Sequence, residues 1–532
     1  MWIPLLVAAA FVGGWIAGEK LCNTHGNTPA EKKLNTILNL IKSDYVDEVN
    51  LDSLLEYTLP QLMTTLDPHS AYISAKDLKA VNDDLDGSFS GIGISFMVNN
   101  DTITVLEVSA GGPAEKVGIV AGDRIVKVNG ENVAGIGISA DHVKTLLRGE
   151  ADTRVKLGVK RQGSKKTYEF EVTRGEIPNK SIDAAYVTIG DIGYIRIGKF
   201  TRATYSEFIT ALNDLTQDGA KSFIIDLRGN GGGVMEAAIL MANEFLPARA
   251  IVMAKKGRDG KEDDIYLSDG TGNYQDVPLT VIIDEYSASS SEILAGAIQD
   301  NDRGLIIGRR SFGKGLIQHQ LVLPDSSAIR LTIARYYTPS GRCIQKDYKF
   351  GQTAAYENDI LERYNHGEAF SADSIKFDTK NIFKTIGGRA VYGGGGIMPD
   401  IFVPNDTSGI TGYYINVANA GLLQRFAFEY CDLNRQELLK SDNVDQLLKR
   451  LPSDDVLLRS FAGFASQNGV PARWYYINIS HGLIVNQLKA LIARDILGIS
   501  AYYAIINKTD ANVLRSIKEI KRGNAVAPIK GE

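Results

Sequence analysis

Three side chains within residues 279–323 have the chemistry for acyl transfer. Ser289 lies in a serine cluster, Lys314 lies between two glycines, and Gln318 follows four residues after the lysine. A serine hydroxyl is a poor nucleophile until a base removes its proton. Lysine can act as that base when burial lowers its pKa, because desolvation disfavours the ammonium form. Ser289 is therefore a candidate nucleophile and Lys314 its candidate base.

Simpler interpretations of these residues stay open. A serine at a helix start is most often only a cap, which applies above all to Ser290 and Ser291. An isolated Gly-Lys-Gly sequence is most often a turn with a solvated lysine. Histidine is the usual base, but none of the six histidines has an obvious triad setting. The nearest, His319, should face away from Gln318 in an alternating strand.

The surrounding residues predict elements that could position this chemistry. Residues 280–283 are a short β-branched run that suits a buried strand. The apolar spacing of residues 293–298 predicts a helix that begins at the serine cluster. Residues 304–308 form a second short apolar strand, and residues 316–323 and 328–337 should form a hairpin.

A glycine-rich loop follows another predicted strand. Residues 222–226 should be buried, and Arg-Gly-Asn-Gly-Gly-Gly at 228–233 precedes a predicted helix. The loop lacks the GxxxxGK[ST] and GxGxxG patterns of phosphate sites. We interpret it as an oxyanion hole, in which backbone N–H groups point at developing negative charge. The candidate donors are the amides of Gly232, Gly233 and Ser290.

Residues 287–318 resemble the active site of the C-terminal processing peptidases, also called tail-specific proteases. Their nucleophile is the middle serine of a Ser-Ala-Ser-x-Ser-Glu run, their lysine base lies 25 residues later and a glutamine lies four beyond, so Ser289, Lys314 and Gln318 match in register. The 226–233 segment is also similar, although many members have proline where this chain has Gly231. The resemblance covers roughly residues 30–405. It implies a multidomain α/β protein with a crotonase/ClpP-like serine protease core.

The phrase LDPHSAYIS at residues 66–74 also occurs in similar form in that family. There it belongs to a helical N-terminal region and not to the active site. We therefore expect His69 to be a structural histidine in an Asp-Pro turn.

Residues 87–175 have a different pattern of predicted elements, with short strands, glycine turns and one helix. The run at 91–94 resembles the carboxylate-binding loop of PDZ domains, and residues 110–129 resemble the PDZ core. The run alone would be a weak glycine-turn signal. Its glycines let successive N–H groups converge on an anion, beside which a peptide tail adds as a strand. The predicted peptide-binding residues, whose pocket should prefer an apolar final side chain, are Gly91, Ile92, Gly93, Ile94, Val143, Leu146 and Leu147.

The N-terminal residues 2–18 are an uncharged apolar run. A bilayer span needs about 20 residues, so the run fits a signal-type segment or a tilted anchor better than a buried core helix. The absence of a small-residue cleavage site favours a retained anchor, and lipidation of Cys22 is a minor alternative. We expect a periplasmic protein of a bacterial envelope, held in the inner membrane by this segment.

Composition sets further limits. At 532 residues the chain should have several domains. A net charge of −5 gives no reason to expect nucleic acid. Three scattered cysteines, with no zinc-like Cys/His spacing, predict no metal and no cofactor.

The predicted organisation places a signal-type segment or anchor at 1–22, a helical region at 23–86, a PDZ domain at 87–175, the protease core at 176–405 and a helical region at 406–532. Residues 346–385 look like an insertion without a readable role. The C-terminal helical region carries no chemical motif and could form a homodimer or carry a lid. Its last residues, 518–532, should fray.

The resemblance implies an exported serine endopeptidase that recognises protein substrates by apolar C-terminal tails. Two alternatives come from other classes. The chain could be a non-catalytic PDZ binding protein or chaperone with a protease-like fold. It could also be a small-molecule-binding relative, since fold does not fix function.

Overall fold

The structure is a computed structural model, which describes residues 28–99, 101–261, 263–375 and 381–525. The apolar run at 2–18 and Cys22 lie outside these ranges. None of the helices within them combines the length and the hydropathy that a bilayer crossing requires.

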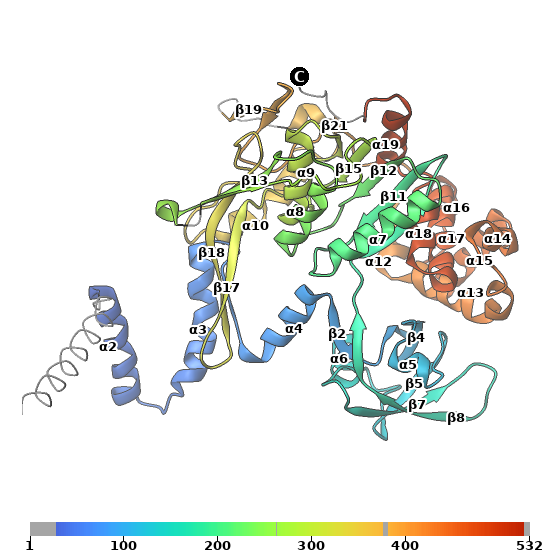
Figure 1. Cartoon of the computed structure of the whole chain (residues 1–532). Coiled ribbons are helices and arrows are strands. Elements are labelled where there is room, and N and C mark those ends of the chain that lie inside the picture. Colours follow the sequence, from blue (N-terminus) through green and yellow to red (C-terminus); the bar gives the residue numbers. More distant parts are fainter. Residues whose placement is uncertain (1–27, 100, 262, 376–380, 526–532) are drawn as a thin grey trace, which may run out of the picture.

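A six-stranded sheet forms the centre of the protein (Figure 1). All neighbouring pairs are parallel except β10 with β11. Strands β12 and β15 are buried at every position, as parallel strands covered on both faces should be. In sheet order the strands are β10 (Ile182–Val187), β11 (Ile192–Ile197), β12 (Ser222–Asp226), β15 (Leu279–Ile283), β16 (Leu305–Gly308) and β21 (Ile401–Phe402).

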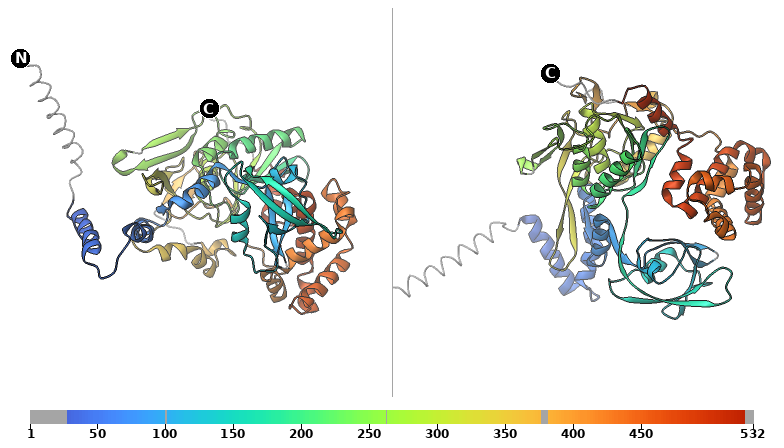
Figure 2. Two further views of the ribbon diagram at one scale, coloured as in Figure 1. Left: turned by 90° about the horizontal axis from the view of Figure 1, so that it is seen from below. Right: turned by 45° about the vertical axis from the view of Figure 1, so that its right-hand side comes forward.

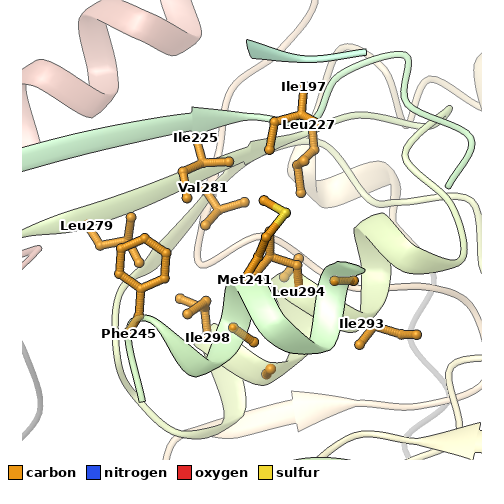
Figure 3. Close-up of a cluster of buried hydrophobic side chains, with 14 of the residues drawn as sticks. Ile197, Ile225, Leu227, Met241, Phe245, Leu279, Val281, Ile293, Leu294 and Ile298 are labelled. Atoms are coloured by element: carbon orange, nitrogen blue, oxygen red, sulfur yellow. The ribbon is translucent and has the colours of Figure 1, made fainter. Parts of the chain in front are cut away.

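Helices cover the two faces of this sheet. Because side chains alternate along a strand, Ile225 packs in the cluster with α7 (Thr204–Gln217), α8 (Met235–Asn243) and α9 (Ser290–Asp300). Its neighbour Ile224 packs on the opposite face, with residues of α19 (Ala511–Lys521). Figure 3 shows the first cluster, where side chains of α8 and α9 meet those of the strands. This packing fixes the start of α9 at the carboxyl end of β15.

A second sheet lies beside the first. Its order is β1-β18-β13-β14, and β17 also pairs with β18. The predicted hairpin is confirmed, because β17 and β18 are antiparallel. Short strands β19 (Ile382–Lys384) and β20 (Ala390–Tyr392) form a separate pair. The strands of the second sheet are β1 (Ala71–Ile73), β13 (Ile251–Gly257), β14 (Asp264–Leu267), β17 (Leu316–Val322) and β18 (Ala328–Tyr337).

Residues between β2 (Ser88–Gly91) and β9 (Gly175–Pro178) form a small unit below the core in Figure 1. Strands β2 and β9 pair with each other and connect the unit to the core. The remaining elements surround their own apolar cluster. They are β3 (Ile94–Asn99), β4 (Thr102–Val108), α5 (Pro113–Lys116), β5 (Arg124–Val128), β6 (Glu131–Asn132), α6 (Ala140–Leu147), β7 (Arg154–Lys160) and β8 (Thr167–Thr173).

Three helices precede this unit, and α2 stands apart from the body of the protein (Figure 2). The N-terminal helices are α2 (Pro29–Asp44), α3 (Leu51–Leu66) and α4 (Ala75–Asp86). Two short helices, α10 (Thr353–Glu357) and α11 (Asp359–Asn365), lie in the predicted insertion, and one-turn 3₁₀ helices lie at Arg258–Gly260 and Ala372–Ser374.

The C-terminal helices pack in two places. Helices α12 to α18 share an apolar cluster of their own, whereas α19 packs on the central sheet. Of residues 518–532, which were predicted to fray, residues 518–525 are held in place by this packing, and Leu279 N donates to Ala525 O at 2.9 Å. Residues 526–532 lie outside the described ranges. The helices are α12 (Gly412–Asn419), α13 (Leu422–Leu438), α14 (Val444–Arg450), α15 (Asp454–Gln467), α16 (Trp474–Ile479), α17 (His481–Leu497) and α18 (Ile499–Ile506).

Candidate active site

Ser289 occupies a sharp turn between β15 and α9. Its backbone has φ 56° and ψ −113°, outside the regions that residues with side chains usually adopt. Such a conformation persists only where the surroundings fix it, and it is common at active sites. Because Ser290 is the first residue of α9, its N–H has no intrahelical acceptor. The turn therefore combines an unusual serine conformation with a helix N-terminus that favours negative charge.

The glycine-rich loop is tied to this serine turn. Ala288 N and Ser291 Oγ donate to Asn230 O at 3.0 and 2.9 Å. Ser290 Oγ donates to Gly233 O at 3.0 Å. The hydroxyls of Ser290 and Ser291 thus join the helix to the loop.

Two glycines of the loop cannot carry side chains. A Cβ on Gly232, which has φ +98°, would lie 2.7 Å from Ser289 Cβ, and one on Gly233 would lie 1.9 Å from Phe200 O. Gly232 N donates to Asn230 Oδ1 at 2.8 Å, so this predicted oxyanion donor is engaged within the loop. The bridge between Phe200 and Gly233 uses Gly232 O and Val234 N, which leaves the Gly233 N–H outside it.

Lys314 and Gln318 are in contact. Lys314 Nζ donates to Gln318 Oε1 at 3.2 Å. Burial lowers the pKa of the Lys314 ammonium, and the nearby positive charge of Arg330 lowers it further. The negative charges of Glu292 and Asp67 oppose this shift. His319, the next residue after Gln318, is exposed on the other face of β17, as expected.

Sequence reasoning missed Glu292, which joins the serine side of the site to the lysine side. Its Oε2 accepts from Ser289 N and from Lys314 N, each at 2.9 Å. Its Oε1 accepts from Gly313 N at 2.7 Å and from Ser311 Oγ at 2.5 Å. Burial raises the pKa of the carboxyl, while these hydrogen bonds act in the opposite direction. The only signal for it was the final glutamate of the serine run.

The position of the Asp-Pro turn corrects the expectation that residues 66–74 lie away from the active site. Gln318 Nε2 donates to the backbone oxygen of His69. The His69 ring lies 2.8 Å, Nε2 to Oη, from Tyr356. Burial and the charge of Lys314 lower the pKa of His69 to about 4, so the ring is neutral near pH 7. The turn therefore supports the glutamine through its backbone, which residue types alone do not reveal.

Residues of the predicted insertion also support the lysine segment. Arg363 donates to Ser311 O at 2.8 Å and to Phe312 O at 3.1 Å. Lys346 N donates to Gly313 O at 3.0 Å, and its ammonium lies 4.0 Å from the centroids of the Phe312 and Tyr356 rings. The insertion thus holds the segment that carries Lys314.

A groove of about 230 Å³ lies in the unit between β2 and β9. Val143 is fully buried in the unit's core and Leu146 packs against that core, so neither is among the residues that line the groove, contrary to prediction. Lys144 of α6 and Arg148, which directly follows the helix, line it instead. Five of the predicted peptide-binding residues do line it, namely Gly91, Ile92, Gly93, Ile94 and Leu147.

The strained serine at a strand-to-helix turn, the largely buried lysine and the separate small β-unit define an α/β serine peptidase with a PDZ domain. A model of peptidase family S41 matches residues 191–353, and a PDZ domain model matches residues 104–161. A model of a family of unknown function matches residues 413–498.

Curated relatives point to one group within this class of peptidases. A carboxy-terminal-processing protease of Bartonella bacilliformis is 36% identical over 319 residues, 59% of this chain and 72% of the relative. Carboxy-terminal processing protease CtpB of Bacillus subtilis is 34% identical over 322 residues, 60% of this chain and 66% of the relative. The chain belongs to the carboxy-terminal processing proteases, which are serine peptidases of family S41.

A solved structure of photosystem II D1 C-terminal processing protease is 30% identical. The match covers 60% of this chain and 91% of that one, with a TM-score of 0.33. The family assignment therefore depends on the sequence relatives.

Proposed function

We propose that this enzyme hydrolyses peptide bonds with a dyad of Ser289 and Lys314, assisted by Gln318. In this mechanism Ser289 Oγ attacks the scissile carbonyl, and neutral Lys314 takes the hydroxyl proton. The lysine then gives a proton to the leaving amine, and water hydrolyses the acyl-enzyme by the same route. The observation that carries this proposal is Glu292, whose Oε2 accepts from the backbone N–H of both Ser289 and Lys314.

The surroundings of Lys314 suit a base. Burial lowers the pKa of the lysine, which raises the neutral fraction at any pH below 10.5, its ordinary value. Gln318 is a neutral partner, so it orients the Nζ atom without stabilising the ammonium as a carboxylate would. One hydrogen of Nζ points to Gln318 Oε1, and the lone pair of the neutral amine is then available for the serine hydroxyl.

The proposed oxyanion donors are the amides of Ser290 and of the glycine loop. In the described conformation the Gly233 N–H is the proposed donor of the loop, because the Gly232 N–H is already donated to Asn230 Oδ1. Gly232 would join only after that bond breaks. One such donor contributes about 3 kcal/mol to the transition state.

The PDZ groove is the proposed binding site for the C-terminal tail of a protein substrate. The glycine-containing loop at 91–94 offers backbone N–H groups to the terminal carboxylate, and Leu147 offers an apolar wall. An apolar final side chain fits this lining. We also propose that tail binding by this domain, which precedes the protease core in sequence, delivers the substrate to the active site. Deletion of residues 87–175 should then change tail selectivity or turnover.

The domain boundaries, the location and the assembly state are also proposed. The division at 86, 175 and 405 agrees with the changes in element type along the chain, and the boundary at 22 lies outside the described residues. Export to a bacterial periplasm and anchoring in the inner membrane depend on the apolar run at 2–18. A homodimer through helical regions has support from α2, in which Leu34 is 56% and Leu40 51% exposed.

The test compares wild type, Ser289→Ala and Lys314→Ala on an unfolded substrate with an apolar C-terminus. We expect cleavage by wild type and a loss of at least about 1,000-fold in both variants. Equal cleavage by all three would overturn the dyad. Tail binding without cleavage by wild type would favour a non-catalytic PDZ binding protein.

A further inference from the structure

A cavity of about 390 Å³ opens beside the turn that leads to Ser289. One wall is Tyr286, in that turn, and another is formed by Arg309 and Arg310, which follow β16. The third wall comes from the insertion, where Leu361 and Tyr364 line the cavity. This third wall lies beyond residues 191–353, which match the peptidase family model.

Two arginines that line the cavity are paired with glutamates of its walls. Arg309 Nε pairs with Glu285 at 2.8 Å, and Arg310 Nη2 pairs with Glu368 at 2.7 Å. All four side chains are largely buried. The exposed lining is therefore mostly apolar, with Tyr286, Leu361 and Tyr364 in it, and exposed Glu357 also borders the cavity.

The same apolar residues are open to solvent at the mouth of the cavity. Tyr286 is 54% exposed, Leu361 58% and Tyr364 51%. Three large apolar side chains that gather around an opening mark a surface that a ligand covers better than water does. A cavity of this volume is in the range of pockets that take small ligands or single side chains.

The chain limits how far this cavity can lie from the reacting serine. Tyr286 precedes Ser289 by three residues, so their Cα atoms are at most about 11 Å apart. An extended peptide advances about 3.3 Å per residue. The distance from Ser289 to Tyr286 is therefore no longer than about three residues of an extended substrate.

We propose that this cavity is a specificity pocket, which receives one large apolar side chain of the substrate close to the scissile bond. The proposal rests on the proposed peptidase function. It assigns to the insertion a second role besides support of the lysine segment, namely selection of the cleavage site. This selection is separate from tail recognition by the PDZ groove.

The test uses the full chain and a peptide series with one common apolar tail and one varied residue at each position around the cleavage site. Leu361→Ala should lower kcat/KM about tenfold for leucine or phenylalanine at one position, and less than about twofold for alanine there. Leu361→Trp should fill the cavity and reverse the preference towards small residues. Leu433→Ala is the matched control, because that leucine is 76% exposed and lies on α13.

The outcomes separate this inference from the proposed function. An unchanged cleavage profile, or an equal fall at every position, would overturn the pocket while Ser289-dependent cleavage by wild type remained. Absence of cleavage by wild type would overturn both. A selective change at one position in the Leu361 variants, with the control unchanged, would support the pocket.

Discussion

The serine side and the lysine side of the active site are held in different ways. Ser289 is fixed by its own neighbourhood, because β15, α9 and the glycine loop all belong to the buried central sheet and its helices. Lys314 lies outside that core and is held by segments far away in sequence, including the turn at His69 and the insertion around Arg363. Glu292 is the side chain that contacts both sides. The comparison suggests a rigid nucleophile and a base whose position depends on remote segments.

The largest effect should come from breaking the link between the two sides. Glu292→Gln removes the charge and turns an NH₂ group towards N–H and O–H donors, so its four hydrogen bonds cannot all persist. We expect at least about a 100-fold loss of kcat and a fall of about 2 kcal/mol in the free energy of unfolding. Urea unfolding and peptide cleavage measure the two effects.

The matched control for this variant is Glu236→Gln, an exposed glutamate in the first turn of α8. It should change neither quantity. Wild-type activity in Glu292→Gln would show that the two sides are held independently.

The serine side alone is tested by Gly232→Ala. A methyl group there would meet Ser289 Cβ at 2.7 Å and Ser290 N at 3.0 Å, in a backbone region that disfavours alanine. We expect about a 30- to 100-fold loss of kcat with a smaller change in KM, since the clash disturbs the oxyanion donors. Gly231→Ala, where no atom lies within 4 Å, should be nearly neutral. Equal effects of the two substitutions would remove the special role of Gly232.

The lysine side alone is tested by Gln318→Ala. Loss of the Oε1 acceptor frees Lys314 Nζ and ends the contact with His69 O, so we expect about a tenfold lower kcat and a shifted acid limb of the pH profile. Val322→Ala is the control, an exposed residue farther along the same strand. A profile that keeps its shape and only loses amplitude would contradict an orienting role for Gln318.

The smallest effect on catalysis is expected at His69, whose contribution is a pH dependence of stability. Its pKa is about 4 in the folded protein against 6.5 normally, so the unfolded chain binds more protons between these values. Stability from this group is present above pH 6.5 and is lost as the pH falls through 4, by at most about 3 kcal/mol. His69→Gln should flatten this part of the stability curve, and exposed His319→Gln should not. If the free energy of unfolding kept the same pH dependence in His69→Gln, His69 would not have the lowered pKa that its burial implies.

The same contrast explains what the sequence could predict. Ser289, Lys314 and Gln318 could be predicted because their spacing along the chain matches the motif of the processing peptidases. The carbonyl of His69 and the guanidinium of Arg363 were not readable, since backbone acceptors carry no sequence signal and the insertion has no motif. Val143 was misplaced because helical spacing does not show which apolar position of α6 faces the core.

The central claim is that Lys314, as a neutral amine, activates Ser289. The most direct measurement is the pH dependence of the rate at which a serine-directed fluorophosphonate acylates Ser289, in wild type and in Lys314→Ala. We predict that the wild-type rate rises with pH along a limb whose pKa lies below the ordinary lysine value of 10.5, and that this limb disappears in the variant with at least about a 100-fold slower reaction. Equal rates and equal pH profiles in the two proteins would contradict the account.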